Sequence, residues 1–196
     1  MIAPPGAVRV SHTVPWVRQL AAATAIAGGL IWISTVVMTA LRPIGHSGAA
    51  RSTLDLHPTI LVAFVLMAWS ATGLASDLRP SRLAWTGAAV SWIAVALFSV
   101  NVAVVLATGD YAPVWLTHYS AFFLMALGMS LLGVAALRLR ALSLAPAIAM
   151  IIAPLPMPLG NMQDDRVLLW LPLGVGSLAV GIAIAFTRHA ARGSVV

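Results

Sequence analysis

Six apolar runs of roughly 20 residues, separated by short polar segments, account for most of this chain. A helix that crosses a bilayer needs about 20 mainly apolar residues. Only helices and closed barrels satisfy their backbone hydrogen bonds in hydrocarbon. We therefore expect an all-α, polytopic membrane protein, a six-transmembrane-helix bundle that forms one domain over residues 1–196. The predicted spans are about 17–41, 58–76, 83–108, 114–137, 141–158 and 167–187.

The composition supports this class and removes several chemistries. Hydrophobic residues make up 61% of the chain, charged residues 8%, and the mean hydropathy is +0.98. These values are typical of a polytopic membrane protein and not of a soluble domain. The absence of cysteine excludes disulfides, thiolate nucleophiles and Cys-ligated zinc or iron–sulfur centres. The absence of lysine excludes a retinal Schiff base and a Walker-type phosphate lysine.

The distribution of arginine predicts the orientation of the chain. If both termini are cytoplasmic, eight of the 11 Arg residues lie in inner segments and three in outer ones. Such an excess on the inside is the positive-inside pattern of integral membrane proteins. We expect both termini in the cytoplasm. The net charge of +6 then reflects arginines that meet anionic lipid headgroups, not a nucleic-acid partner.

The fifth predicted span contains three prolines, Pro154, Pro156 and Pro158. Each proline removes a backbone donor and clashes with the preceding turn, so a regular helix should stop near Ala153. In hydrocarbon, non-helical backbone survives only where protein or a water-filled cavity surrounds it. We therefore expect a fifth helix broken by prolines and an outward-facing polar pocket lined by spans 2, 4 and 5.

Polar residues next to this break, and at the start of spans 2 and 4, supply the candidate ligand-binding residues. Ionisable groups drawn into a membrane boundary often mark a functional path. The alternative is that they are loop residues solvated at the interface. The candidates are His57, His118, Tyr119, Asn161, Gln163, Asp164, Asp165 and Arg166.

Two histidines and several aspartates also raise the question of metal and acid–base chemistry. His57 and His118 are candidate axial ligands of a b-type haem, or ligands of a divalent metal shared with Asp55 or Asp164. No two histidines lie four residues apart on one helix, so helix-terminal histidines that bind backbone or headgroups are the alternative. The candidate catalytic residues are Asp164, Asp165, Asp110 and His118. Asp164 and Asp165 are adjacent, and neighbouring carboxyl groups shift each other's pKa values apart.

Short motifs between residues 42 and 118 resemble a known group. These are the Arg42-Pro43 exit from the first span, the outer loop with Ser52 and Asp55, and Asp110 followed by His118 at the start of the fourth span. Together they resemble small six-helix bacterial membrane proteins that are grouped as a domain of unknown function. The resemblance implies the six-helix fold and implies no activity.

Three classes of function follow from these features. The favoured hypothesis is a small membrane protein that acts as a subunit of a membrane complex or binds lipid, quinone or pigment. Its partners would be membrane lipids and other membrane subunits or further copies of itself. The first alternative is a membrane-embedded enzyme that acts on a lipid or isoprenoid with Asp and His chemistry. The second is a small-solute transporter.

Overall fold

The computed structural model describes residues 14–42, 54–78, 81–109, 115–160 and 165–192, and within these ranges the chain is helical without any strand. Four long helices come first: α1 (Pro15–Ala40), α2 (His57–Asp77), α3 (Arg82–Thr108) and α4 (Trp115–Arg138). α5 (Leu144–Ile152) is short, and α6 (Leu171–Arg192) is long. Single-turn or short 3₁₀ helices lie at η1 (Leu54–Leu56), η3 (Met157–Leu159) and η4 (Asp165–Trp170).

Within the described ranges, five helical segments are long and apolar enough to cross a membrane: α1, α2, α3, α4 and the continuous η4–α6 segment. This confirms the all-helical class and the membrane-like character that the sequence predicts. The remaining predicted span, about 141–158, contains only the nine residues of α5 in α-helical form. Nine residues rise about 14 Å, which is about half of the hydrocarbon thickness.

Local sequence signals mark several helix ends. Proline occupies the first turn of α1 and of α2, where a missing N–H leaves no intrahelical bond unmade. The Ser81 hydroxyl accepts a hydrogen bond from the Ala84 N–H at 3.2 Å and caps the start of α3. α3 ends at Gly109, whose φ of 67° is the left-handed conformation that glycine adopts without strain.

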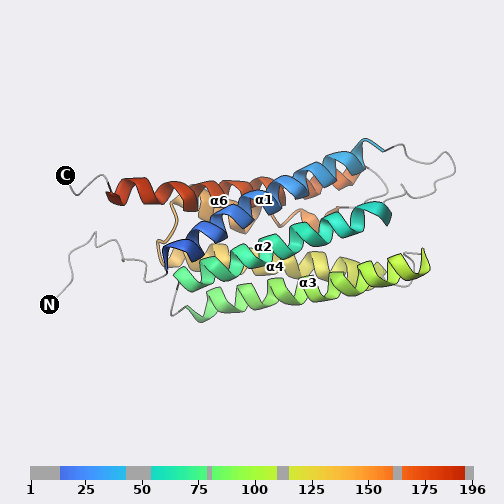
Figure 1. The fold of residues 1–196 in the computed structure, drawn as a ribbon, viewed down its shortest axis with the longest axis horizontal. Coiled ribbons are helices and arrows are strands. Elements are labelled where there is room, and N and C mark those ends of the chain that lie inside the picture. The colour runs from blue at the N-terminus through green and yellow to red at the C-terminus, as the bar shows by residue number, and fades with distance from the viewer. Residues whose placement is uncertain (1–13, 43–53, 79–80, 110–114, 161–164, 193–196) are drawn as a thin grey trace.

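The helices form a closed ring in which each packs against its neighbours in the chain and α6 returns to α1 (Figure 1). α1 begins and α6 ends at the same end of the bundle, which we call the terminal end (Figure 1). At the opposite end α1 and α3 end and α2 and α4 begin, and we call it the histidine end because α2 starts there with His57.

Glycines bring two pairs of helices into close contact. A Cβ added to Gly29 of α1 would lie 2.7 Å from the Gly174 carbonyl oxygen of α6. A Cβ added to Gly87 of α3 would lie 2.7 Å from the Gly128 carbonyl oxygen of α4. Lipid tails are as apolar as the helices, so such close backbone packing and interhelical hydrogen bonds replace the hydrophobic effect as the source of association.

An irregular stretch connects α5 to Gly160. Two indole side chains make hydrogen bonds that connect this stretch to η4 and η4 to α1. Trp170 donates its indole N–H to the Met157 carbonyl at 2.8 Å, and Trp32 donates to the Trp170 carbonyl at 2.7 Å. Gly160 packs directly against Trp170, where a Cβ would overlap the indole nitrogen. The indoles thus give buried donors to two backbone carbonyls, one of which, Met157, also accepts from the Gly160 N–H at 3.1 Å.

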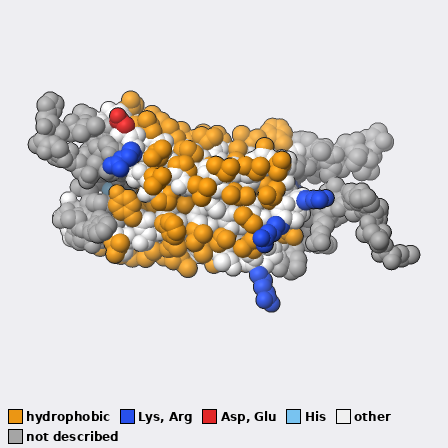
Figure 2. Space-filling view, turned by 180° about the vertical axis from the view of Figure 1, so that it is seen from behind, with side chains coloured by type: hydrophobic (Ala, Val, Ile, Leu, Met, Phe, Trp, Pro, Cys, Tyr) orange, Lys and Arg blue, Asp and Glu red, His pale blue; other side chains and the backbone are white. Residues whose placement is uncertain are grey.

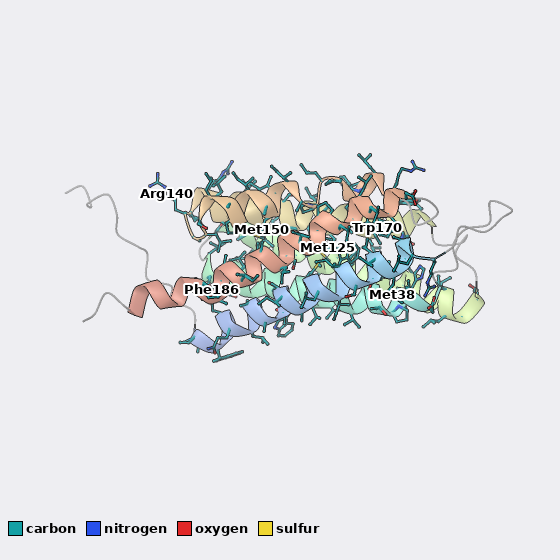
Figure 3. The ribbon with its side chains drawn as sticks, turned by 90° about the horizontal axis from the view of Figure 1, so that it is seen from above. Met38, Met125, Arg140, Met150, Trp170 and Phe186 are labelled. Carbon is teal, nitrogen blue, oxygen red and sulfur yellow. The ribbon has the colours of Figure 1, made fainter. Side chains whose placement is uncertain are left out.

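The outer surface is a broad apolar band with charged side chains towards its ends. Figure 2 shows this band on one face, with arginines at both ends of the bundle. At the terminal end, Arg18 of α1 lies 3.5 Å from Asp77 of α2. Figure 3 shows Trp170, Met125 and Met150 on three different elements along the bundle, and Arg140 projecting from the end at which α5 begins. The surface thus has the layering expected of a protein that lies across a bilayer.

Candidate functional site

Two histidines from different helices meet inside the histidine end of the bundle. His57 is the first residue of α2 and His118 is in the first turn of α4. Their side chains are 1% and 2% exposed, and their ring centroids are 5.8 Å apart at an interplanar angle of 54°. The structure therefore brings together the two histidines that the sequence singles out separately. Ionisable side chains buried in a membrane helix bundle are functional candidates by default.

Phenylalanines cover the faces of both imidazoles. Phe98 of α3 lies parallel to His57, with a centroid distance of 6.1 Å and an angle of 2°. Phe98 also contacts His118 at 5.4 Å, and Phe122 stacks on His118 at 4.5 Å. Aromatic rings thus pack against both imidazoles, whose hydrogen-bonding atoms are the ring nitrogens at their edges.

The aromatic packing continues from the histidines into the centre of the bundle. Trp170 packs on Phe122 at 4.5 Å, and Trp32 stacks on Phe64 at 5.4 Å. Each of the four long helices α1 to α4 thus contributes one large ring to this cluster, and η4 adds Trp170. Pairs of this kind contribute about 0.5–1.5 kcal/mol beyond the area they bury. The aromatic cluster therefore fixes the relative rotation of the helices that carry the histidines.

A buried amide lies in the turn of α3 above Phe98. Asn101 is fully buried, and its Oδ1 accepts a hydrogen bond from the Thr117 hydroxyl at 2.5 Å. Thr117 directly precedes His118, so this bond ties the start of α4 to α3. Asn101 of α3 and Thr117 of α4 thus form a hydrogen-bonded polar pair next to the start of the His118 turn.

Asp55, a metal-ligand candidate, forms a salt bridge on the surface. Both of its oxygens accept hydrogen bonds from Arg42 at 2.6 Å, and its side chain is 63% exposed. These hydrogen bonds are the main reason that the pKa of the Asp55 carboxyl lies below its usual value, and the charge of Arg42 acts in the same direction. The Asp55 carboxylate is therefore directed to Arg42, although it precedes His57 by two residues.

The remaining candidates are dispersed or lie outside the described residues. Asp165 and Arg166 are exposed at the start of η4. Tyr119 packs edge-on against His118 at 5.8 Å but is 37% exposed. The four candidates Asp110, Asn161, Gln163 and Asp164 lie outside the described residues.

The described residues bring together two of the candidate metal ligands, His57 and His118, with Phe98 beside both rings. Among the described residues, no group of three or more metal-ligating side chains is assembled. We therefore derive no reaction step from a haem or a divalent ion.

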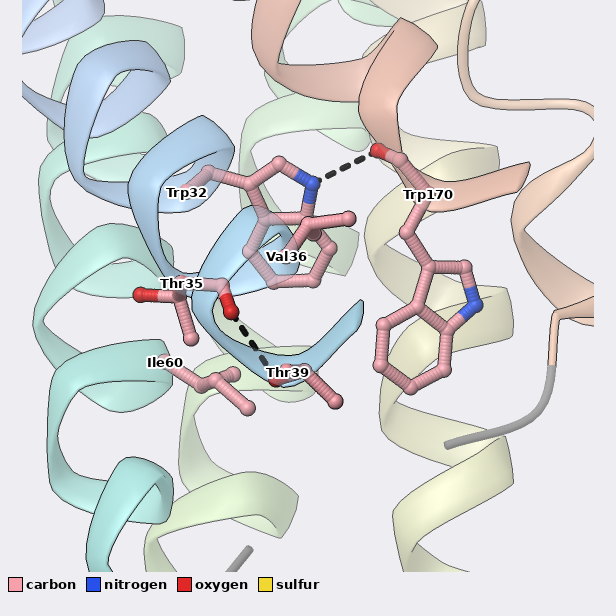
Figure 4. Close-up of a pocket in the computed structure, with 6 residues that line it drawn as sticks. All are labelled: Trp32, Thr35, Val36, Thr39, Ile60 and Trp170. Atoms are coloured by element: carbon pink, nitrogen blue, oxygen red, sulfur yellow. Dashed lines mark hydrogen bonds between the residues drawn. The ribbon is translucent and has the colours of Figure 1, made fainter. Parts of the chain in front are cut away.

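A small recess beside the aromatic cluster is also filled by its own side chains. It is lined by Trp32, Thr35, Val36, Thr39, Ile60 and Trp170 (Figure 4). The space between them does not admit a water molecule. The Thr39 hydroxyl donates to the Thr35 carbonyl at 2.8 Å, within the same helix. This recess therefore serves packing between α1, α2 and η4.

Sequence reasoning missed the aromatic residues around the histidines, although their spacing carries a signal. Phe122 follows His118 by four residues, and Phe64 follows His57 by seven. Both intervals place side chains on one face of a helix. Phe98 precedes Asn101 by three residues and follows the same rule. The signal identifies a shared face within each helix but not the partner helix that this face meets.

No protein-family model, no curated protein and no solved structure matches this chain.

Proposed function

We propose that this protein is an integral membrane protein that binds a small lipid-soluble ligand at its histidine end, and that the ligand is of the quinone class. The observation that carries the proposal is the buried contact between His57 and His118 within a wall of aromatic rings. Apolar side chains would fill this core without the free-energy cost of burying two polar imidazoles. Their presence supports a role in recognising a polar group.

The chemistry of the pair favours a quinone head group. An imidazole edge donates or accepts a hydrogen bond, and the carbonyl oxygens of a quinone accept one. The planar head group stacks on aromatic rings such as those that surround the histidines. Its isoprenoid tail is soluble in the bilayer next to the bundle. Such a ligand combines the polar, planar and apolar properties that the site presents.

The described carboxylates support binding more than acid–base catalysis. Asp55 pairs with Arg42, Asp77 pairs with Arg18 at the other end of the bundle, and Asp165 is exposed. Asp55 is near enough to His57 for their charges to interact, but its hydrogen bonds go to Arg42, and Asp77 lies at the opposite end of the bundle. Binding within a larger membrane complex, or within a homo-oligomer, is compatible with the same site.

We propose six crossings, with the segment from α5 to Gly160 as the fifth. At one level of the bundle, Gly133 of α4 faces Met150 of α5. Met157 is bonded to Trp170, which packs on Phe122, 11 residues earlier in α4 than Gly133. Eleven helical residues correspond to about 16 Å. The segment thus continues towards the histidine end after α5, which supports the resemblance to six-helix bacterial membrane proteins.

We propose that the terminal end faces the cytoplasm of a bacterial cell, because the positive-inside count places most arginines there. The chain contains no cysteine, so single cysteine variants test this directly. Both Ser143, at the terminal end, and Asp165, at the histidine end, are exposed. An impermeant maleimide should label Asp165→Cys in intact cells and Ser143→Cys only after lysis. The opposite pattern would invert the orientation.

Quenching of tryptophan fluorescence tests the binding proposal. A short-chain quinone added to the detergent-purified protein should quench the emission of Trp170 and Trp32 saturably, because these indoles belong to the aromatic cluster. His118→Leu and His57→Leu should each lower the affinity at least tenfold, which is about 1.4 kcal/mol. Tyr119→Phe, which keeps the aromatic edge against His118, is the matched control.

Native mass spectrometry of the same samples reports bound lipid-soluble molecules and the number of chains. Loss of a co-purified quinone in both histidine variants, and its retention in Tyr119→Phe, supports the proposal. If quenching is unsaturable, or if the histidine variants bind as tightly as the original protein, the proposed function is wrong.

A further inference from the structure

The outer side of α5 carries a shallow, open apolar recess, away from the histidine pair. All of its lining residues belong to α5 and the residue after it, and they recur at intervals of three to four along the helix. They are Leu144, Ala145, Ile148, Ala149, Ile152 and Ala153. No charged or hydroxyl-bearing side chain is among them. The recess is therefore a site for hydrocarbon.

The recess exists because α5 is short and packs on α6 through small residues. A Cβ added to Gly176 of α6 would lie 2.8 Å from the Ala153 Cβ. The backbones approach closely at this point, and the larger side chains Leu144, Ile148 and Ile152 remain partly or largely exposed beside it. The result is a groove that opens towards the bilayer on the side of α5.

Arg140 lies where α5 and its groove begin (Figure 3), and Arg138 precedes it by two residues. Arg138 is the last residue of α4, and Arg140 lies between α4 and α5, four residues before Leu144. Both side chains are exposed, and Figure 3 shows Arg140 projecting outward where α5 begins. Within the described residues, the salt bridges involve other arginines. The groove is thus lined by apolar side chains and has positively charged side chains near one end.

The backbone at Arg140 gives independent evidence that its side chain matters. Arg140 has φ 51°, the left-handed conformation, and the described residues contain no other non-glycine residue with positive φ. It follows the last turn of α4, where the Ala141 N–H donates to the Ala136 carbonyl at 3.0 Å. Glycine is the usual residue at this position of a helix end, because a side chain there is strained. The strained backbone at Arg140 is the kind of feature that occurs at functional positions.

We propose that this groove binds one anionic phospholipid, with its phosphate on Arg138 and Arg140 and an acyl chain along Leu144, Ile148 and Ile152. Guanidinium groups bind phosphate through paired, charge-assisted hydrogen bonds. Basic side chains beside an apolar groove at the cytoplasmic surface are the expected form of a lipid headgroup site. A free phosphate would leave the groove empty, and a zwitterionic lipid would not use the net positive charge. This site is independent of the histidine pair.

Lipid-dependent thermal stability in detergent tests the proposal. Added phosphatidylglycerol or cardiolipin should raise the Tm of the original protein by several degrees, whereas phosphatidylcholine and inorganic phosphate should not. Native mass spectrometry should show one retained anionic lipid per chain. The double variant Arg138→Gln/Arg140→Gly should lose both effects. Arg140→Gly suits the left-handed backbone, so the Tm without lipid should stay equal or rise.

Two matched controls separate the headgroup from the acyl chain. Arg166→Gln removes an exposed arginine at the other end of the bundle and should leave the lipid effect unchanged. Ile148→Trp fills the groove and should reduce the lipid-induced Tm shift at least threefold. Ile93→Trp, on the exposed face of α3, should not.

Several results would overturn the inference. These are an equal Tm shift with phosphatidylcholine, an equal shift with inorganic phosphate, or an unchanged shift in the double variant. If Ile148→Trp keeps the full shift and the retained lipid, the acyl chain does not occupy the groove and the proposal is also wrong.

Discussion

The indole N–H of Trp32 donates a hydrogen bond to the backbone carbonyl of Trp170, 2.7 Å away and 138 positions later in the chain. Trp170 donates its own indole N–H to the Met157 carbonyl at 2.8 Å. The two bonds connect α1, η4 and the irregular stretch after α5. Each bond satisfies a buried indole N–H, which would otherwise be left without an acceptor in an apolar surrounding.

Replacing Trp32 by Phe tests the first of these bonds. The ring remains in the aromatic cluster, but the Trp170 carbonyl loses its donor. We expect the free energy of unfolding, measured by SDS titration in mixed micelles, to fall by about 1–3 kcal/mol. Trp16→Phe, which alters an exposed indole, should change it by less than about 0.5 kcal/mol. Equal effects of the two variants would show that the bond contributes nothing to stability.

Gly160→Ala tests the contact between the irregular stretch and Trp170. The new methyl group would overlap the indole nitrogen, so the Trp170–Met157 hydrogen bond must break or the backbone must shift. We expect a loss of about 1–3 kcal/mol in the free energy of unfolding, the usual cost of overpacking. In a Trp170→Leu background the same change should cost clearly less, because the obstacle is gone. Additive losses would contradict a direct contact between the two residues.

The contact between the two buried imidazoles predicts coupling. His57→Leu and His118→Leu should be non-additive in the free energy of unfolding, with an interaction energy of about 0.5–3 kcal/mol. The reference is a second cycle of His118→Leu with Ser177→Ala, because Ser177 is bonded to the Ala25 carbonyl between α6 and α1. That cycle should be additive within about 0.5 kcal/mol. Additivity in the histidine cycle would mean that the rings do not interact.

The pair of Asp55 and Arg42 predicts a small pH dependence. The pKa of Asp55 is lowered in the folded protein, so the stabilising contribution of the pair is complete above the unfolded value of about 3.9 and is lost as the pH falls through the lower folded value. Because the side chain of Asp55 is largely exposed, we expect at most about 1 kcal/mol at pH 7.

Comparison of the original protein with Asp55→Asn over pH 3–7 measures this contribution. The difference in stability between the two proteins should be largest near neutral pH, shrink below about pH 4, and also shrink in 1 M salt because exposed charges are screened. A difference that grows as the pH falls would have the wrong sign for a carboxyl whose pKa is lowered by an arginine.

The long helices were predictable because their causes are local. A bilayer-length apolar run must form a helix when no water is present to bind its backbone, and the residues that decide this are neighbours in sequence. Pro15, Pro58 and Gly109 mark helix ends for equally local reasons. The same logic identifies His57 and His118 as polar residues at helix starts, on the same side of the bundle.

The meeting of these histidines was decided by the tertiary structure. Whether His57 faces His118, or lipid, depends on the rotation of α2 and α4 about their axes. Close packing restricts both rotations, because Gly128 of α4 lies against Gly87 of α3 and Gly73 of α2 lies against Ala21 of α1. Likewise, no local rule relates Asp55 to Arg42 or Trp32 to Trp170. By itself, the sequence determined which segments are helical and apolar, because backbone hydrogen bonding and hydropathy act over adjacent residues. Only the packing of helices distant in sequence decided which rings and polar groups share the core.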